Sequence, residues 1–203
     1  MLIMYISQIL KVMLAILVIC TQAYSTTQQL RHGASVFMEY CIGCHSLQAV
    51  RYQQLRKDLA IDTLDIAHLR SLHLPSQPSD LYTSLSKKDA RNWFASVPPD
   101  LSMIALILGK KELKQYLYGF YPDVMRNFGS ANNQRPGINM PDVLAPLRQD
   151  REKLDSTIDD LIEFLEYTAD PSITVRTYMG ILLLCIIVII GFVLINYAKL
   201  IFV

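Results

Sequence analysis

The segment Cys41-Ile42-Gly43-Cys44-His45 constrains this chain more than any other, because it joins two thiols at a fixed spacing to an adjacent imidazole. C-x-x-C-H is the pattern of c-type haem attachment. Cysteines three positions apart can form thioethers with the two vinyl groups of one porphyrin edge, and the histidine that follows can bind iron from the proximal side. The motif therefore predicts one covalently attached haem c, held by Cys41 and Cys44, with His45 as an iron ligand.

Three other kinds of site use cysteines at this spacing: a zinc site, a redox-active dithiol and a disulfide. A zinc site needs further ligands at knuckle spacing, and the remaining cysteines, Cys20 and Cys185, lie in strongly apolar segments. A thioredoxin-like dithiol is expected in a βαβ context, and no alternating strand pattern surrounds the motif. Haem attachment is favoured over all three.

The N-terminal end of the chain is apolar and resembles a targeting segment. Residues 1–23 contain Lys11, an apolar run from Val12 to Cys20 and the small residue Ala23, which is the arrangement of a cleavable secretory signal. Since apolar residues also precede Lys11, a retained N-terminal anchor is the alternative. Either form delivers the following domain across the membrane, where c-type haem is attached in bacteria.

The C-terminal end predicts a membrane anchor. Residues 178–197 carry no charge, begin and end with tyrosine, and are long enough for one transmembrane helix with an aromatic belt. Lys199 lies beyond this stretch, so we expect residues 198–203 to form a cytoplasmic tail and residues 172–177 a linker. The haem domain, residues 24–171, is then expected on the periplasmic side of a bacterial inner membrane.

The sequence between the ends predicts an all-α domain. Apolar residues recur at helical spacing in three sets: Val36, Phe37 and Tyr40; Leu113, Tyr116, Leu117 and Phe120; and Ile158, Leu161, Ile162 and Leu165. Ser156 with Asp159 predicts a capping box at the start of the third helix, and Pro171 follows its end. Residues 75–78, 97–100 and 130–137 are polar or proline-rich and are expected to form loops over the porphyrin.

The second iron ligand is expected to be a methionine, because methionine opposite histidine raises the reduction potential of an electron-transfer haem. The candidates between the apolar ends are Met38, Met103, Met125 and Met140. Met38 lies on the helix that leads into the motif, and Met103 lies at a predicted helix start, where methionine is more often a core filler. Met140 lies in a proline-stiffened loop, far enough along the chain to reach the distal face. Spacing favours Met140, and leaves open the alternatives His68, His73 and Met103. His32 is interpreted as a surface residue.

The chain resembles the cytochrome c1 family, the haem subunits of ubiquinol–cytochrome c reductase (respiratory complex III), in their bacterial form. The resemblance covers nearly the whole length, and its order and spacing are more specific than any one element. The matching segments are Arg31-His32-Gly33, Cys41–Leu47, Val50-Arg51-Tyr52, Trp93-Phe94, Pro98–Ser102, Phe120-Tyr121, Gly137–Leu144, Asp160–Leu165, Ala169–Pro171, Arg176 and Met179-Gly180.

The resemblance implies a class I cytochrome c-like haem domain with His45 and Met140 as the iron ligands. It also implies that Pro98 and Pro99 line the haem pocket and that Arg31 and Tyr52 make structural contacts near the haem.

The chain departs from the family pattern after Ser102. Relatives usually carry arginines there, one of which pairs with a haem propionate, whereas this chain has Leu106 and Leu108. Lys110 or Lys111 is a candidate substitute, although both also fit ordinary solvated lysines.

The resemblance further implies that the chain passes single electrons from the Rieske iron–sulfur protein to a soluble or tethered cytochrome c, beside cytochrome b and lipid in a dimeric complex. It implies no substrate-transforming site and no catalytic residue in this chain. The rival hypotheses are a haem peroxidase with open iron coordination, a free-standing membrane-anchored electron shuttle, and a structural anchor. The balance of 19 basic and 18 acidic residues argues against nucleic acid as a partner.

Overall fold

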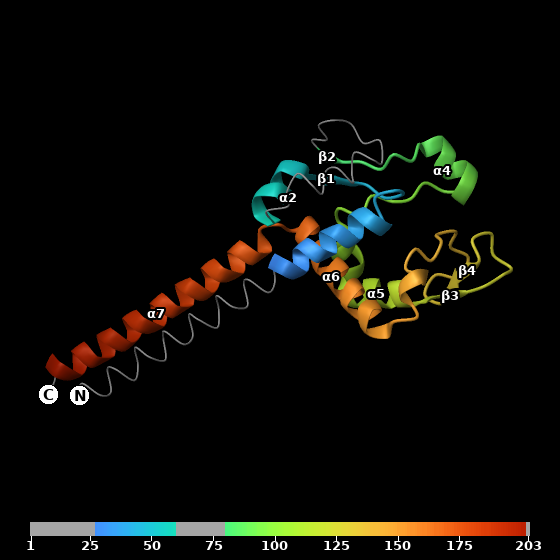
Figure 1. Cartoon of the computed structure of the whole chain (residues 1–203). Helices are drawn as coiled ribbons and strands as arrows, with labels where there is room; N and C mark the ends of the chain where they lie inside the picture. The colour runs from blue at the N-terminus through green and yellow to red at the C-terminus, as the bar shows by residue number, and fades with distance from the viewer. Residues whose placement is uncertain (1–26, 60–79, 202–203) are drawn as a thin grey trace. The chain divides into compact units, whose positions relative to one another are not determined.

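The computed structural model describes residues 27–59 and 80–201 of the chain (Figure 1). It divides into a first unit that ends at Ala169 and a second unit that begins at Asp170. The predicted signal, the ligand alternatives His68 and His73, and the predicted loop at residues 75–78 lie outside the described residues.

The first unit is mostly helical. Residues 27–40 form a helix that leads into the C-x-x-C-H motif. The later helical elements are α2 (Tyr52–Leu59), α4 (Lys87–Phe94), α5 (Ile104–Tyr118), the 3₁₀ turn η1 (Ala145–Leu147) and α6 (Arg151–Ala169).

Two small antiparallel sheets correct the all-α prediction. Strand β1 (Leu47–Arg51) pairs with β2 (Asp80–Leu81), and β3 (Phe120–Pro122) pairs with β4 (Ser130–Asn132). These strands are two to five residues long. Strands this short show little of the polar–apolar alternation by which a strand is recognised in sequence.

The helix of residues 27–40 crosses α6 at Gly33. A Cβ atom on Gly33 would lie 2.0 Å from the Asp160 carbonyl oxygen and 2.8 Å from Cβ of Phe164, so only glycine permits this approach. His32 Nδ1 lies 2.7 Å from the Asp160 carboxylate beside the crossing, and the rings of Phe37 and Phe164 pack 5.9 Å apart. This contact fixes the helix that carries the haem motif against the best-buried helix of the unit.

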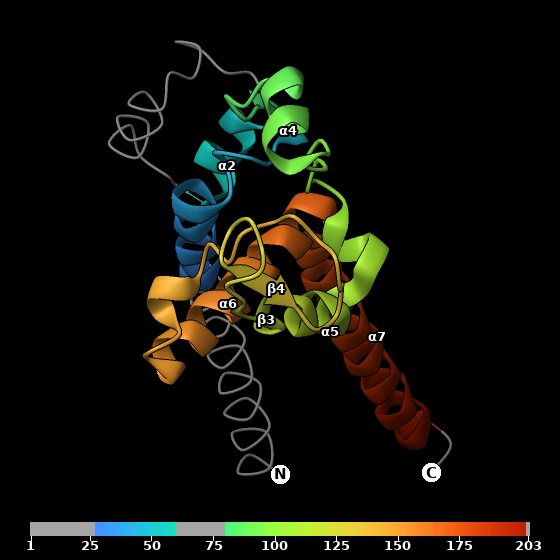
Figure 2. The same cartoon turned by 90° about the vertical axis from the view of Figure 1, so that its right-hand side faces the viewer.

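Helix α5 packs on α6 from another side (Figure 2). Leu113 and Leu117 are buried, as the predicted helix face requires, whereas Phe120 belongs to β3. The Lys110 ammonium group reaches the carboxylates of Glu163 at 2.6 Å and Glu166 at 2.9 Å at the exposed edge of the contact.

The predicted start of α6 is wrong. Ser156 lies inside the helix, and its hydroxyl donates a hydrogen bond to the Lys153 carbonyl oxygen. Asp150 precedes the helix, and its carboxylate accepts the Lys153 N–H at 3.0 Å. A carboxylate that satisfies a free N–H of the first turn is an effective helix start. The helix therefore begins at Arg151, about one and a half turns before the capping-box start. The end of α6 before Pro171 is confirmed.

The second unit is formed around helix α7 (Ile173–Ile201). Asp170 precedes it and accepts hydrogen bonds from the Ser172 hydroxyl and the Arg176 guanidinium, each at 2.7 Å, which lower the pKa of its carboxyl group. Apolar side chains in the middle of α7, from Ile181 to Ile190, are largely exposed. Judged on the described residues alone, the chain contains no helix with the length and apolarity of a membrane span.

Candidate haem site

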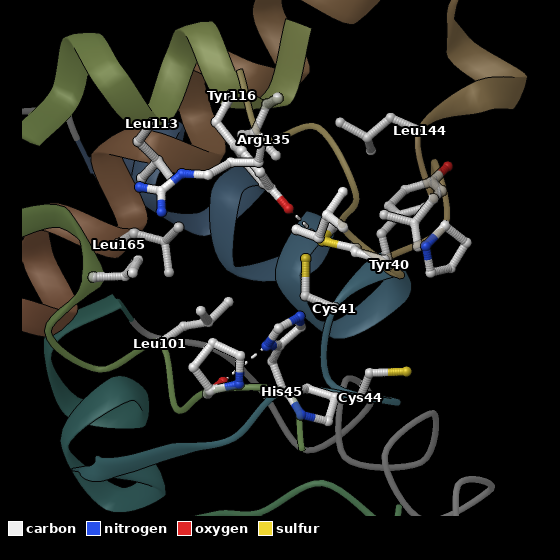
Figure 3. Close-up of a pocket in the computed structure, with 18 of the residues that line it drawn as sticks. Tyr40, Cys41, Cys44, His45, Leu101, Leu113, Tyr116, Arg135, Leu144 and Leu165 are labelled. Carbon is white, nitrogen blue, oxygen red and sulfur yellow. Dashed lines mark hydrogen bonds between the residues drawn. The ribbon is translucent and has the colours of Figure 1, made fainter. Parts of the chain in front are cut away.

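A cavity of about 320 Å³ in the first unit brings together most of the predicted haem contacts (Figure 3). Its walls are predominantly apolar, as in cofactor sites generally, and its volume falls in the range of such sites. The predicted residues that line it are Cys41, Cys44, His45, Pro98, Pro99 and Met140.

His45 is oriented by a main-chain carbonyl group. The helix before the motif ends in a turn in which the N–H groups of Cys44 and His45 both donate to the Cys41 carbonyl oxygen, at 3.0 and 2.9 Å. Nδ1 of His45 lies 2.8 Å from the Pro99 carbonyl oxygen. Because a carbonyl oxygen only accepts, Nδ1 carries the hydrogen and Nε2 keeps a free lone pair, as in metal-ligating histidines.

Burial also favours the neutral form of this imidazole. Desolvation lowers the pKa of His45, against the opposing effects of the Pro99 hydrogen bond and the Asp100 charge. Neutral imidazole is the form that binds a metal. Geometry and protonation state therefore both fit His45 to an iron ligand.

The Pro98–Ser102 segment is fastened to the strand that follows the motif. The Asp100 carboxylate accepts the N–H groups of Gln48 at 2.8 Å and Ser102 at 2.9 Å. The Ser102 hydroxyl accepts the Ala49 N–H at 3.0 Å. These bonds hold the Pro99 carbonyl oxygen against His45, which gives the prolines of this segment a positioning role.

The two cysteines are free thiols in the structure. Burial raises the pKa of Cys41 to about 12 and raises the pKa of Cys44 in the same direction, so both are protonated at neutral pH. Figure 3 shows Cys41 beside His45 and Cys44 farther out, with its sulfur directed away from His45. Within the described part of the chain, no group of three histidine, cysteine or acidic side chains is placed to hold a metal ion.

Met140 reaches the cavity from a loop shaped by a tight turn. The Ile138 N–H donates to the Arg135 carbonyl oxygen at 3.2 Å, Pro136 occupies the second position of the turn, and Gly137 has φ +89° in the third. Proline followed by a residue with positive φ is typical of a type II turn. The Tyr116 hydroxyl donates to Met140 Sδ at 3.1 Å (Figure 3), and burial raises the pKa of Tyr116 to about 12, so the phenol remains a donor.

Side-chain hydrogen bonds, two of them to main-chain carbonyl groups of distant segments, hold the Met140 loop. Asn139 donates from Nδ2 to the Phe94 carbonyl oxygen at 2.9 Å. Asp142, whose side chain is 7% exposed, is paired with Arg148, which also donates to the Leu117 carbonyl oxygen at 3.0 Å. Sequence reasoning missed these contacts, because the bonds to Phe94 and Leu117 join distant residues and the six-residue spacing of Asp142 and Arg148 matches no helix or strand period.

The other methionines considered lie elsewhere. Met103 is 44% exposed and directly precedes α5, so its interpretation as a core filler is wrong: the end of a helix leaves the side chain in solvent. Met125 is 88% exposed, and Met38 packs against the hydrophobic core without lining the cavity. His32 is exposed, as predicted.

Arg31 and Tyr52 do not line the cavity. Arg31 donates from Nε to the Leu59 carbonyl oxygen at 2.5 Å, so it contacts the end of α2. Tyr52 begins α2 and is buried. Of the two leucines considered in the segment after Ser102, Leu108 lines the cavity and Leu106 is 63% exposed.

Comparison with known sequences and the geometry of the cavity both indicate a haem protein. The profile of the Cytochrome C1 family matches residues 19–203. The chain belongs to the cytochrome c1 family. Membership implies a covalent haem c, and an imidazole with a free Nε2, two thiols and a methionine that line one apolar cavity fit such a group.

Two of the similar proteins are named cytochrome c1, and a third carries a different name. Cytochrome c1 of Allochromatium vinosum is 40% identical over 61% of this chain and 50% of its own length. A Nitrosomonas europaea protein named ammonia monooxygenase gamma subunit is 30% identical over 77% of this chain and 75% of its own length. Mitochondrial cytochrome c1 of Neurospora crassa is 29% identical over 78% of this chain and 57% of its own length. The chain thus spans about half the length of the relatives named cytochrome c1.

Proposed function

We propose that this chain is a membrane-anchored c-type cytochrome that passes single electrons from the Rieske iron–sulfur protein to a cytochrome c within respiratory complex III. The observation that supports this most is the placement of the C-x-x-C-H motif and Met140 on one apolar cavity. An enclosed six-coordinate haem suits electron transfer, since it offers no open iron position to a peroxide substrate.

In this proposal Cys41 and Cys44 attach the haem, and Nε2 of His45 and Sδ of Met140 bind its iron. The haem supplies a one-electron iron couple. The protein sets the potential of that couple: the methionine sulfur and the apolar walls favour the reduced state, and Pro99 holds the imidazole in the binding tautomer. No catalytic residue is assigned.

The C-terminal helix is proposed as the anchor. The uncharged residues 178–197 fall within α7, which continues to Ile201 without a break. An uncharged, apolar stretch of this length in sequence suits a lipid environment. The haem domain is then periplasmic at a bacterial inner membrane, with the C-terminus cytoplasmic, beside cytochrome b in a dimeric complex.

The Nitrosomonas europaea relative supports a second candidate function. Its match covers about three quarters of both chains, a larger share than the cytochrome c1 of Allochromatium vinosum. The alternative is therefore an electron-transfer subunit of an oxygenase system, or a free-standing shuttle, with the same haem and different partners.

Purification of the full chain from membranes in mild detergent tests the proposal. We expect a c-type haem spectrum and co-purification of cytochrome b and the Rieske protein in stoichiometric amounts. A haem protein that purifies with oxygenase subunits would support the second candidate, and a haem protein that purifies alone would support the shuttle.

Truncation tests the anchor separately. We expect a chain that ends at Pro171 to leave the membrane fraction with a normal haem spectrum, because the haem contacts all lie in the first unit. A truncated product that stays in the membrane would show that the N-terminal segment is retained as an anchor.

A further inference from the structure

Arg135 lines the haem cavity. The inference drawn from this position depends on the proposed function. Among the described residues that line the cavity, Arg135 alone carries a permanent charge. A haem brings two propionate carboxylates to a site that is otherwise apolar, and a carboxylate beside apolar walls needs a cation or several hydrogen-bond donors. The guanidinium fork suits this task, since it can bind a carboxylate with two parallel hydrogen bonds.

The guanidinium of Arg135 lies at the rim of the cavity and is only partly engaged. Its Nη2 donates to Glu112 Oε1 at 3.0 Å, and the two side chains are 54% and 52% exposed. One such bond leaves further N–H donors free. Figure 3 shows Arg135 beside Tyr116 and Leu113, along the wall that α5 contributes.

The backbone at Arg135 is fixed from the protein interior. Asn132 is 1% exposed, and its Oδ1 accepts the N–H groups of Gln134 at 2.8 Å and Arg135 at 3.2 Å. The Asn132 Nδ2 donates to the Tyr116 carbonyl oxygen at 2.8 Å, which ties this turn to α5. The turn that follows presents Met140, so one segment carries both the distal methionine and the charged rim residue.

The two lysines considered from the sequence are placed less well. Lys110 is engaged by Glu163 and Glu166 on α6 and does not line the cavity. Lys111 lines an adjoining surface hollow that it shares with Glu112, Tyr116 and Arg135, but it does not line the haem cavity.

We propose that Arg135 pairs with a haem propionate and thereby supplies the counter-charge for which Leu106 and Leu108 on α5 offer no side chain. Glu112 holds the guanidinium at the rim and competes with the propionate for it. The site thus receives its cation from the distal loop instead of from α5.

The pH dependence of the haem midpoint potential, measured on the full chain in detergent, tests this assignment. A nearby arginine favours an ionised carboxylate, typically by a factor of ten or more in proton affinity. Arg135→Leu is therefore expected to move the propionate-linked inflection to higher pH by at least about one unit. Arg135→Lys, which keeps the charge without the fork, should move it less.

Two neighbouring variants serve as controls, because Lys111, Glu112 and Tyr116 are the titratable side chains that share the adjoining hollow with Arg135. Lys111→Leu should change the proton affinity of the propionate by less than about twofold, because an exposed charge has a weak effect. The inflection should therefore stay close to its original pH. Glu112→Gln should move it to lower pH, because it removes a competing anion. Each variant is first checked for covalent haem and methionine ligation.

The assignment is overturned if Arg135→Leu keeps the haem, its methionine ligation and the original inflection, or if Lys111→Leu produces the larger shift. Absence of covalent haem from the unmodified chain would instead overturn the proposed function. The two failures are therefore distinguishable in one set of samples.

Discussion

The proximal and distal walls of the haem cavity are held by different means. On the proximal side, His45 follows directly after the attachment cysteines, and the main-chain carbonyl of Pro99 orients its ring. On the distal side, Met140 lies in a loop held by side-chain contacts: the Asp142–Arg148 pair, whose arginine also donates to the Leu117 carbonyl oxygen, and Asn139, which donates to the Phe94 carbonyl oxygen.

This difference has a physical cause. A ligand adjacent to a covalent attachment point needs only local geometry, because the thioethers already bring it to the iron. A ligand far along the chain must be delivered by the fold, so its contacts determine whether the iron stays six-coordinate. We therefore expect mutations near the motif to affect haem attachment. Mutations in Asn139, Asp142 and Arg148, the distal clamp of the Met140 loop, should affect iron ligation and stability.

Removal of an attachment cysteine should have the largest effect. Cys41→Ala or Cys44→Ala leaves at most one thioether, and we expect a severe loss of haem-containing protein in each case. Haem-dependent peroxidase staining after denaturing electrophoresis measures this directly, since axial bonds do not survive the treatment whereas thioethers do. Staining of both variants at the level of the unmodified protein would show that these cysteines do not attach the haem.

Removal of the distal clamp should cost stability and ligation together. Arg148→Leu leaves the Asp142 carboxylate almost buried without its cation, and we expect the free energy of unfolding to fall by about 2–3 kcal/mol. Denaturant unfolding gives this value, and loss of the red-region absorption of methionine-ligated haem reports displacement of Met140.

Arg126→Leu is the matched control for that variant. Arg126 pairs with Asp123 at 4.0 Å at a more exposed position, and such pairs contribute less than about 1 kcal/mol. Equal losses in the two variants would show that the Asp142–Arg148 pair has no special role in the distal wall.

Loosening of the proximal hydrogen bonds should have the smallest effect. Asp100→Asn keeps one acceptor oxygen and should destabilise the fold by about 1 kcal/mol, whereas Asp100→Ala removes both acceptors and should cost more. Covalent haem should remain in both variants. Loss of haem from the alanine variant would show that the proximal wall also depends on contacts outside the motif.

The contrast between local geometry and contacts made by the fold also explains how much could be predicted from the sequence. The C-x-x-C-H motif, the helix face at Val36 and Phe37 and the buried positions Leu113 and Leu117 were accessible, because each is a local pattern. The iron-binding roles of His45 and Met140 stay predictions, although both residues line the cavity.

Other features were not predictable because they depend on tertiary contacts. The strands are too short to alternate, and Asp150 rather than Ser156 begins α6 because the preceding turn places its carboxylate against a free N–H. Arg135 has no local signal that separates it from a solvated arginine. Only the fold brings it to the cavity that Met140 lines.

The central claim is that Met140 supplies the distal iron ligand. Leucine is close to methionine in volume, so Met140→Leu should cost less than about 1.5 kcal/mol in packing while it removes the sulfur. Met103→Leu, at an exposed position, is the control.

The most direct measurement is the red-region charge-transfer absorption of the oxidised full chain, which reports a methionine–iron bond. The account predicts that the band is present in the unmodified protein and in Met103→Leu. It predicts that Met140→Leu lacks the band, has a lower reduction potential and binds carbon monoxide when reduced. An unchanged band in Met140→Leu, with unchanged potential and no carbon monoxide binding, would contradict it and assign the ligand to another residue.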